Sequence, residues 1–137
     1  MGRHTITKRI EFCYGHRLLN HKGKCCHLHG HNALLEVEIE AETLDPNGMV
    51  IDFGGVRVAV KEWLDTHLDH TMLLCKQDPA VQALKALQEP CYVMDENPTA
   101  ENIAKLLFEQ IHKMGFRVTE VRLWETPSSF ATYARNQ

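Results

Sequence analysis

Histidine is concentrated in one short stretch of this chain. Three imidazoles alternate in the run His27-Leu-His29-Gly-His31, and His16 precedes them in a segment that can form a neighbouring strand. Side chains two positions apart on a strand point to the same side, so these three imidazoles share one face. A catalytic zinc ion takes three protein ligands and keeps a fourth position open. The spacing therefore predicts an enzyme with a zinc site built from three of these four histidines.

The spacing leaves the role of the zinc ion open. Zinc can act as a Lewis acid on a substrate oxygen, or it can generate hydroxide from a bound water molecule. The alternative without metal is a set of hydrogen-bonded polar histidines at the start of a strand. Five of the nine histidines fall within residues 16–31, and this clustering favours the metal site.

Two thiols, Cys25 and Cys26, come immediately before the histidine run and follow a lysine. Nearby positive charge favours the reactive thiolate, so either thiol can serve as base, nucleophile or metal ligand. The chain has an odd number of cysteines and no export signal, which favours free thiols over a disulfide framework. We expect the other three cysteines to be packing residues: Cys13, Cys75 and Cys91.

Carboxylates at two further places can take part in chemistry. Asp69 and His70 are adjacent, as in the pairs that orient a catalytic proton carrier, although a charge pair at a helix end is the alternative. Glu125 shares the parity of the apolar residues of its strand, and a carboxylate on a core-facing side is costly unless it is paired. Glu125 is therefore expected either to bind a ligand rich in hydrogen-bond donors or to reach water at the strand end.

Composition limits the class of protein. The 137 residues, 44% hydrophobic and 24% charged, fit one globular domain over residues 1–137. A net charge of -3 argues against nucleic-acid or membrane-surface binding. No apolar run is long enough for a membrane span or a secretory signal, so we expect a cytoplasmic protein. Residues 1–35 are locally basic, which suits either a solvated surface or a phosphorylated substrate.

Hydrophobic patterning predicts the strands that carry these groups. Residues 33–42 alternate between apolar and acidic side chains, which indicates a half-buried strand with residues 5–12 as a plausible partner. A turn at 45–48 predicts a hairpin to a short strand at 49–51. Residues 116–126 and 130–133 are expected to form two closing strands.

Three helices are expected between the early and late strands. The first covers 53–67 after the N-cap Asp52, and the second covers 79–88. The third begins with Asn97 as its N-cap and Pro98 as its first helical residue, and it ends at Gly115. Strands first, helices in the middle and strands last favour an antiparallel α+β domain.

Four separated motifs, in order, resemble the family of 6-pyruvoyltetrahydropterin and 6-carboxytetrahydropterin synthases. They span most of the chain, and the combination of Cys-x-x-x-His-Gly-His with an upstream His-Arg-Leu is specific to that family. The motifs are Phe12-Cys-Tyr-Gly-His16-Arg-Leu, Cys25-Cys-His-Leu-His29-Gly-His31-Asn, Leu68-Asp-His70 and Trp124-Glu-Thr126.

The resemblance implies a zinc-dependent lyase acting on 7,8-dihydroneopterin triphosphate. Position by position, it implies that His16, His29 and His31 bind Zn²⁺ and that Cys25 is the catalytic thiolate. Substrate hydroxyls would occupy the open zinc position, and triphosphate would leave toward the basic N-terminal region. On this basis we expect His27 to lie outside the metal site.

The resemblance assigns roles to five more residues. Asp69 and His70 would complete a proton relay with Cys25, and Glu125 would accept hydrogen bonds from the pterin ring. Thr99 and Glu101 match a substrate-contact region of the family, although capping alone also explains that segment.

Motif spacing indicates the branch of the family. Three residues separate Cys25 from His29, as in the bacterial 6-carboxytetrahydropterin synthases of the queuosine and deazapurine route. The family fold is the tunnelling fold, an α+β architecture with a four-stranded antiparallel sheet and helices on one face. It assembles into barrels, typically hexamers, with sites between subunits. The alternatives are a 6-pyruvoyltetrahydropterin synthase or related pterin lyase, and a non-enzymatic zinc-dependent binding protein.

Overall fold

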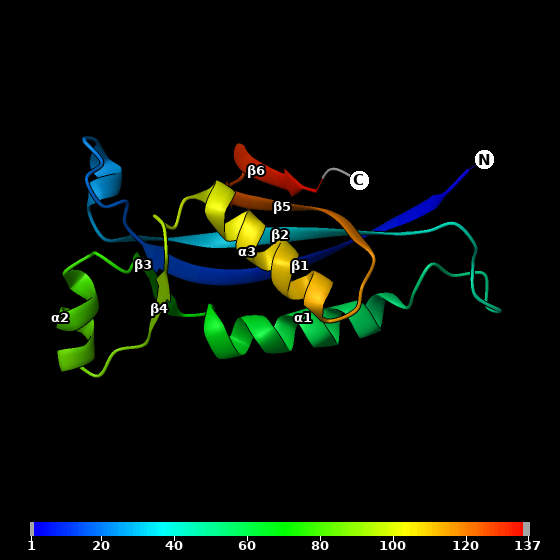
Figure 1. Cartoon of the computed structure of the whole chain (residues 1–137), viewed down its shortest axis with the longest axis horizontal. Coiled ribbons are helices and arrows are strands. Elements are labelled where there is room, and N and C mark those ends of the chain that lie inside the picture. The colour runs from blue at the N-terminus through cyan, green and yellow to red at the C-terminus, as the bar shows by residue number, and fades with distance from the viewer. Residues whose placement is uncertain (1, 136–137) are drawn as a thin grey trace.

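A long antiparallel strand pair organises the fold (Figure 1). β1 (His4–His16) and β2 (His29–Ala41) pair from His4 opposite Ala41 to His16 opposite His29. The predicted strand at 33–42 is therefore confirmed, with an earlier start, and so is its partner near the N-terminus. A short 3-10 helix, η1 (Lys24–Cys26), lies in the connection between the two strands.

The computed structural model describes residues 2–135, which leaves Met1 and residues 136–137 of the expected domain outside the described part. The sheet has six strands in the order β4-β3-β1-β2-β5-β6. After β2 the elements are α1 (Phe53–His67), β3 (Thr71–Cys75), α2 (Ala80–Ala86), β4 (Cys91–Met94), α3 (Ala100–Lys113), β5 (Val118–Thr126) and β6 (Ser129–Ala134).

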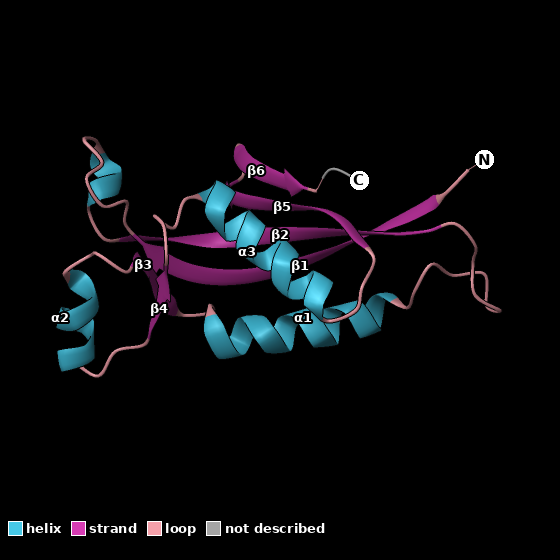
Figure 2. Cartoon of the chain, in the orientation of Figure 1, coloured by secondary structure: helices cyan, strands magenta, loops and turns pink. Residues whose placement is uncertain are grey.

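Two helices, α1 and α3, cover one face of the sheet, while α2 lies beside β3 and β4 at one end (Figure 2). Alternate residues of β1, β2 and β5 point toward α1 and α3 and form the core. Each helix contributes an apolar stripe at helical spacing, as the sequence predicts. The stripes are Val56, Val60 and Leu64 on α1, and Ile103, Leu107 and Ile111 on α3.

The expected α+β architecture with helices on one face of the sheet is confirmed, but the sheet is larger than the four antiparallel strands expected. β3 runs parallel to β1, and β4 runs parallel to β3. These two short strands follow α1 and α2 respectively, and parallel strands need such crossover connections. The extra strands place residues 69–70, at the end of α1, against the middle of the sheet.

Two local predictions are wrong. Residues 49–51 form no strand, because β1 and β5 already occupy both sides of β2 and because the Asp45 carboxylate accepts the N–H groups of Asn47 and Met49 within its own turn. The N-cap of α3 is Thr99 rather than Asn97, since the Thr99 hydroxyl accepts the Asn102 N–H at 3.1 Å.

None of the helices in residues 2–135 is long and apolar enough to cross a membrane.

Candidate metal centre and active site

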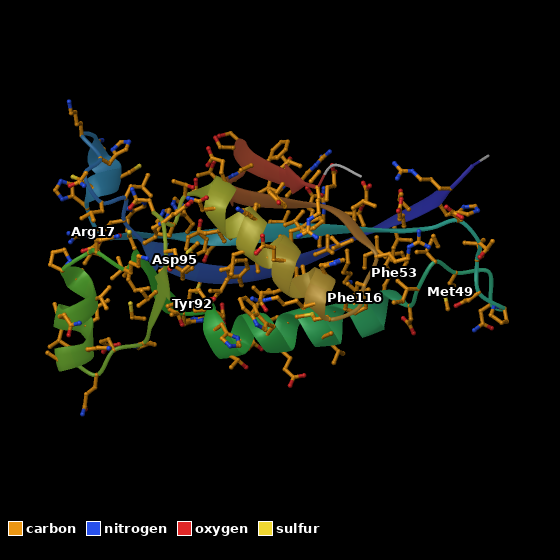
Figure 3. The ribbon with its side chains drawn as sticks, viewed as in Figure 1. Arg17, Met49, Phe53, Tyr92, Asp95 and Phe116 are labelled. Carbon is orange, nitrogen blue, oxygen red and sulfur yellow. The ribbon has the colours of Figure 1, made fainter. Side chains whose placement is uncertain are left out.

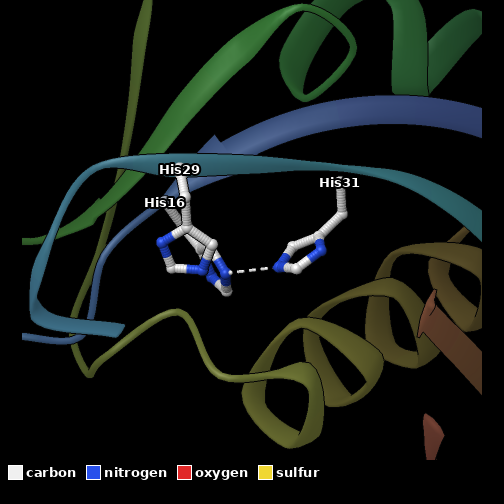
Figure 4. A group of neighbouring side chains, drawn as sticks. All are labelled: His16, His29 and His31. Atoms are coloured by element: carbon white, nitrogen blue, oxygen red, sulfur yellow. Dashed lines mark hydrogen bonds between the residues drawn. The ribbon is translucent and has the colours of Figure 1, made fainter. Parts of the chain in front are cut away.

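Three imidazoles, those of His16, His29 and His31, meet on the helix-covered face of the sheet (Figure 4). His16 lies directly across from His29 in the strand pair, and His31 is two residues further along the same face of β2. The Nε2 atoms of His16 and His31 are 3.2 Å apart, and one ring nitrogen from each histidine lies within 4.8 Å of the others. The three ring nitrogens are therefore close enough together to share one ion.

Backbone carbonyls orient two of these rings. The Nδ1 of His16 lies 2.6 Å from the Pro98 oxygen, and the Nδ1 of His29 lies 2.7 Å from the His27 oxygen. A carbonyl can only accept, so each Nδ1 carries the hydrogen and each Nε2 has a free lone pair for a metal. The His27 side chain itself is exposed and precedes β2. His27 thus contributes its carbonyl to the site.

Burial favours the metal-binding form of two ligands. Burial lowers the pKa of His16, and its neighbours His29 and His31 lower it further, against the opposing effects of Pro98 and Glu125. Burial also lowers the pKa of His31. Neutral imidazole is the form that coordinates a metal. The donor chemistry and the free Nε2 atoms fit Zn²⁺ with three nitrogen ligands.

The Glu125 carboxylate points into this cluster from β5. Its Oε2 lies 3.4 Å from the His16 Nε2, 3.1 Å from the His31 Nε2 and 3.3 Å from the Tyr14 hydroxyl. Burial raises the pKa of Tyr14, and the Glu125 charge raises it further, so Tyr14 stays protonated and its hydroxyl donates a hydrogen bond to the carboxylate. Sequence reasoning missed Tyr14, although its position two residues before His16 on the same strand face was a usable signal.

A pocket of about 280 Å³ adjoins Glu125 where α3 meets β6. Glu101, in the first turn of α3, and Glu125 both line this pocket, together with residues 129–132 of β6. Thr99 lies two residues before Glu101, and its hydroxyl caps the helix. The structure therefore brings Glu101 close to Glu125 and gives Thr99 a structural hydrogen bond.

The Asp69–His70 pair lies on the opposite face of the sheet. Asp69 accepts the backbone N–H of Cys13 at 2.9 Å and also contacts the His70 Nδ1 at 2.9 Å. Burial would raise the pKa of the Asp69 carboxyl, but these hydrogen bonds and the Lys61 charge outweigh it and hold the pKa below its usual value. The Cys13 side chain, next to His70, points away from the face that carries His16.

Cys25 lies in η1, near the end of β1, and its carbonyl accepts the Leu18 N–H at 2.8 Å. Among the described residues, the thiol grouped with Asp69 and His70 is that of Cys13. The expected relay of Cys25 with Asp69 and His70 is therefore not assembled within one chain, because Cys25 lies in η1 and outside the group formed by Cys13, Asp69 and His70.

Two side-chain contacts hold the connection around η1 in place. The Arg17 guanidinium makes two hydrogen bonds to the buried Asp78 carboxylate, one of them 2.7 Å long, in the segment that begins α2. Arg17 lies at the end of the molecule that carries α2 (Figure 3). Asn97 accepts the Leu19 N–H at 2.8 Å and donates to the Leu19 carbonyl at 3.1 Å. The segment that begins α3 thus holds both His16, through Pro98, and the chain that follows β1.

An α+β fold with a three-histidine centre and an adjacent carboxylate defines a candidate catalytic metalloprotein. Residues 5–136 match the family described as 6-pyruvoyl tetrahydropterin synthase, and the chain belongs to this family. A 6-carboxy-5,6,7,8-tetrahydropterin synthase from Rickettsia conorii is 42% identical over 131 residues, covering 90% of this chain and 95% of the relative. The chain is accordingly an enzyme of the pterin synthase type.

Solved structures share this fold and confirm the expected tunnelling fold. An uncharacterized protein from Wolinella succinogenes is 27% identical, with a TM-score of 0.83 over 99% of this chain and 100% of the other. The 6-pyruvoyl tetrahydropterin synthase of Caenorhabditis elegans is also 27% identical, with a TM-score of 0.74 over 99% and 98% of the two chains.

Proposed function

We propose that this protein is a Zn²⁺-dependent 6-carboxy-5,6,7,8-tetrahydropterin synthase. It converts 7,8-dihydroneopterin triphosphate and one water molecule into 6-carboxy-5,6,7,8-tetrahydropterin, acetaldehyde and triphosphate, and its product enters queuosine and deazapurine biosynthesis. The convergence of His16, His29 and His31 carries the proposal. The name of the Rickettsia conorii relative and the three-residue gap between Cys25 and His29 support this branch.

The three imidazoles would hold the zinc ion through their Nε2 atoms, and the carbonyls behind His16 and His29 keep those rings oriented. When bound, zinc polarises the hydroxyl oxygens of the substrate side chain and acidifies the neighbouring protons. Cys25, on the turn before β2, serves as the thiolate that takes a proton from this side chain.

The pterin ring would lie against Glu125. A carboxylate can accept two hydrogen bonds at once from a ring amino group and the adjacent ring N–H. The Tyr14 hydroxyl holds one Glu125 oxygen. Glu125 and Glu101 both line the pocket between α3 and β6, which has room for a ring edge rich in hydrogen-bond donors. Thr99 contributes by fixing the start of α3 beside this pocket.

Asp69 and His70 would complete the proton relay from a neighbouring subunit. The His70 side chain is 80% exposed, on the sheet face opposite to the three imidazoles, so it is accessible to another copy of the chain. The Asp69 carboxylate fixes the His70 Nδ1 and leaves its Nε2 free to exchange a proton. The active enzyme is therefore a homo-oligomer, a hexamer by family resemblance, with its sites between subunits.

Mass spectrometry of the pterin product tests this proposal. Zinc-loaded protein and 7,8-dihydroneopterin triphosphate should give a pterin with a carboxyl group at C6. Cys25→Ala should abolish turnover and retain zinc, whereas the adjacent Cys26→Ala should remain active. A pyruvoyl product would transfer the protein to the 6-pyruvoyltetrahydropterin synthase branch, and full activity of Cys25→Ala would overturn the role of that thiol.

A further inference from the structure

Cys13, Asp69 and His70 form a second group of metal-binding side chains. We propose that they bind a second divalent ion, Zn²⁺ or a similar thiophilic metal, and that this ion inhibits the enzyme. The site lies on the sheet face that α1 and α3 leave uncovered, away from the three-histidine centre. Its inhibitory consequence rests on the role proposed above for Asp69 and His70, whereas metal binding at the site does not.

The three ligand atoms already lie together. One atom each from the Cys13 thiol, the Asp69 carboxylate and the His70 ring lies within 4.8 Å of the others. The group combines one sulfur, one oxygen and one imidazole nitrogen, each of which is a common protein ligand of Zn²⁺. The cluster is partly exposed, so its side chains have room to turn toward an ion.

Backbone hydrogen bonds hold the ligands at this separation. The Asp69 carboxylate accepts the Cys13 N–H at 2.9 Å, and the His70 N–H donates to the Cys13 carbonyl at 2.8 Å. Asp69 and His70, which follow α1, are thereby attached to β1 near its C-terminal end. His70 adopts a left-handed backbone conformation with a φ of 57°, which these contacts maintain. Less conformational entropy is therefore lost when an ion binds.

The surroundings leave room for an ion and its water ligands. A pocket of about 660 Å³ opens over the cluster, and its lining includes Glu11 and Asn32. Lys61 also lines the pocket, and its ammonium group, whose charge acts on Asp69, is paired with Asp65 at 2.6 Å. Three protein ligands and an open side are the features of a zinc site that keeps exchangeable positions.

Metal binding at this cluster would compete with the proton relay. The Asp69 Oδ2 and the His70 Nδ1 contact each other at 2.9 Å, and an ion that takes either of these two atoms removes that contact. A metal-bound imidazole nitrogen also has no lone pair left to accept a proton. Zinc beyond one ion per chain is therefore expected to lower kcat, with the three-histidine ion still in place.

Cobalt titration separates the two sites, because the three-histidine centre has no sulfur ligand. Purified protein titrated with Co²⁺ should bind two ions per chain, and one of them should show the near-ultraviolet charge-transfer absorption of a thiolate ligand. Cys13→Ser should bind one ion without this absorption. Cys91→Ser, which changes another partly exposed thiol, should behave like the unaltered protein. Binding of a single ion, or a thiolate absorption that survives Cys13→Ser or disappears in Cys25→Ser, would overturn the site.

Activity provides the second test. Excess Zn²⁺ should lower kcat of the unaltered enzyme and of Cys91→Ser, and Cys13→Ser should resist this inhibition. Equal inhibition of both variants would overturn the inhibitory role. If the protein binds the second Co²⁺ ion but makes no 6-carboxytetrahydropterin, the proposed function fails while the metal site stands.

Discussion

The Nδ1 atom of buried His16 lies 2.6 Å from the carbonyl oxygen of Pro98, in the segment that begins α3. This contact connects a proposed metal ligand on β1 to a segment more than eighty residues later in the chain. It sets the ring orientation and presents the Nε2 atom to the centre of the cluster. The position of the segment at 97–98 is therefore expected to control metal affinity.

Asn97→Ala should weaken zinc binding by about tenfold or more, which is the usual effect of losing a contact that orients a metal ligand. Asn97 holds its segment to Leu19 through two hydrogen bonds. Competition with a chelator of known zinc affinity measures the change. Asn97→Asp keeps an acceptor for the Leu19 N–H and should recover part of the affinity. Equal zinc affinity in all three proteins would contradict this role.

His16→Ala and His27→Ala form a matched pair that tests the choice of ligands. His16→Ala removes one of the three convergent imidazoles and should leave the purified protein with little zinc. His27→Ala leaves the backbone carbonyl behind His29 intact, so its zinc content should stay at one ion per chain. Metal analysis by mass spectrometry measures both variants. Loss of zinc from His27→Ala alone would reverse the assignment.

Strand periodicity was enough to predict most of this centre. His29 and His31 share a face because side chains alternate along a strand, whichever strand β2 pairs with. His27 was included by the same parity, but β2 begins at His29, so parity does not extend to it. The contact between His16 and Pro98 could not be predicted, because it depends on how α3 packs against the sheet.

The surroundings of the thiols could not be predicted from the local sequence alone. Sequence context singled out Cys25 and Cys26, the family resemblance chose Cys25, and Cys13 was assigned to packing, yet Cys13 is the thiol beside Asp69 and His70. That contact depends on β3 pairing in parallel with β1, which carries the end of α1 to the middle of the sheet. β3 and β4 have only five and four residues, too few for their periodicity to stand out in the sequence.

Subunit mixing tests whether two chains share one active site. Cys25→Ala and His70→Ala proteins should each be inactive when assembled alone. Random reassembly of equal amounts should restore about a quarter of the sites, because one interface in four then joins two intact residues. Activity is measured after the mixture is dissociated and reassembled, with each variant treated alone as the control. Absence of recovery in an assembled mixture would contradict shared sites.

The Arg17–Asp78 pair should contribute strongly to stability. Asp78 is 2% exposed, so Arg17→Met leaves a buried carboxylate without its partner, at a cost of about 3–5 kcal/mol. Asp78→Ala should cost less, because the Arg17 side chain, 26% exposed, can turn toward water. Urea unfolding at neutral pH measures both variants. Equal stability of the two variants would contradict this asymmetry.

The same pair predicts a loss of stability in acid. The Arg17 hydrogen bonds hold the pKa of Asp78 below its ordinary value, so the folded protein binds this proton less readily than the unfolded chain does. The stabilisation is complete above the ordinary aspartate pKa and is lost as the pH falls through the lower folded-state pKa. Asp78→Asn should flatten the dependence of unfolding free energy on pH below about pH 4. If the unfolding free energy of this variant falls with decreasing pH as steeply as that of the unaltered protein, other carboxylates cause the acid dependence.

The molar ratio of acetaldehyde to triphosphate released from 7,8-dihydroneopterin triphosphate tests the central claim most directly. A three-histidine zinc centre that serves 6-carboxytetrahydropterin formation predicts one acetaldehyde for each triphosphate, with both products absent for His16→Ala. Triphosphate released without acetaldehyde would contradict the proposed reaction and indicate a pyruvoyl product.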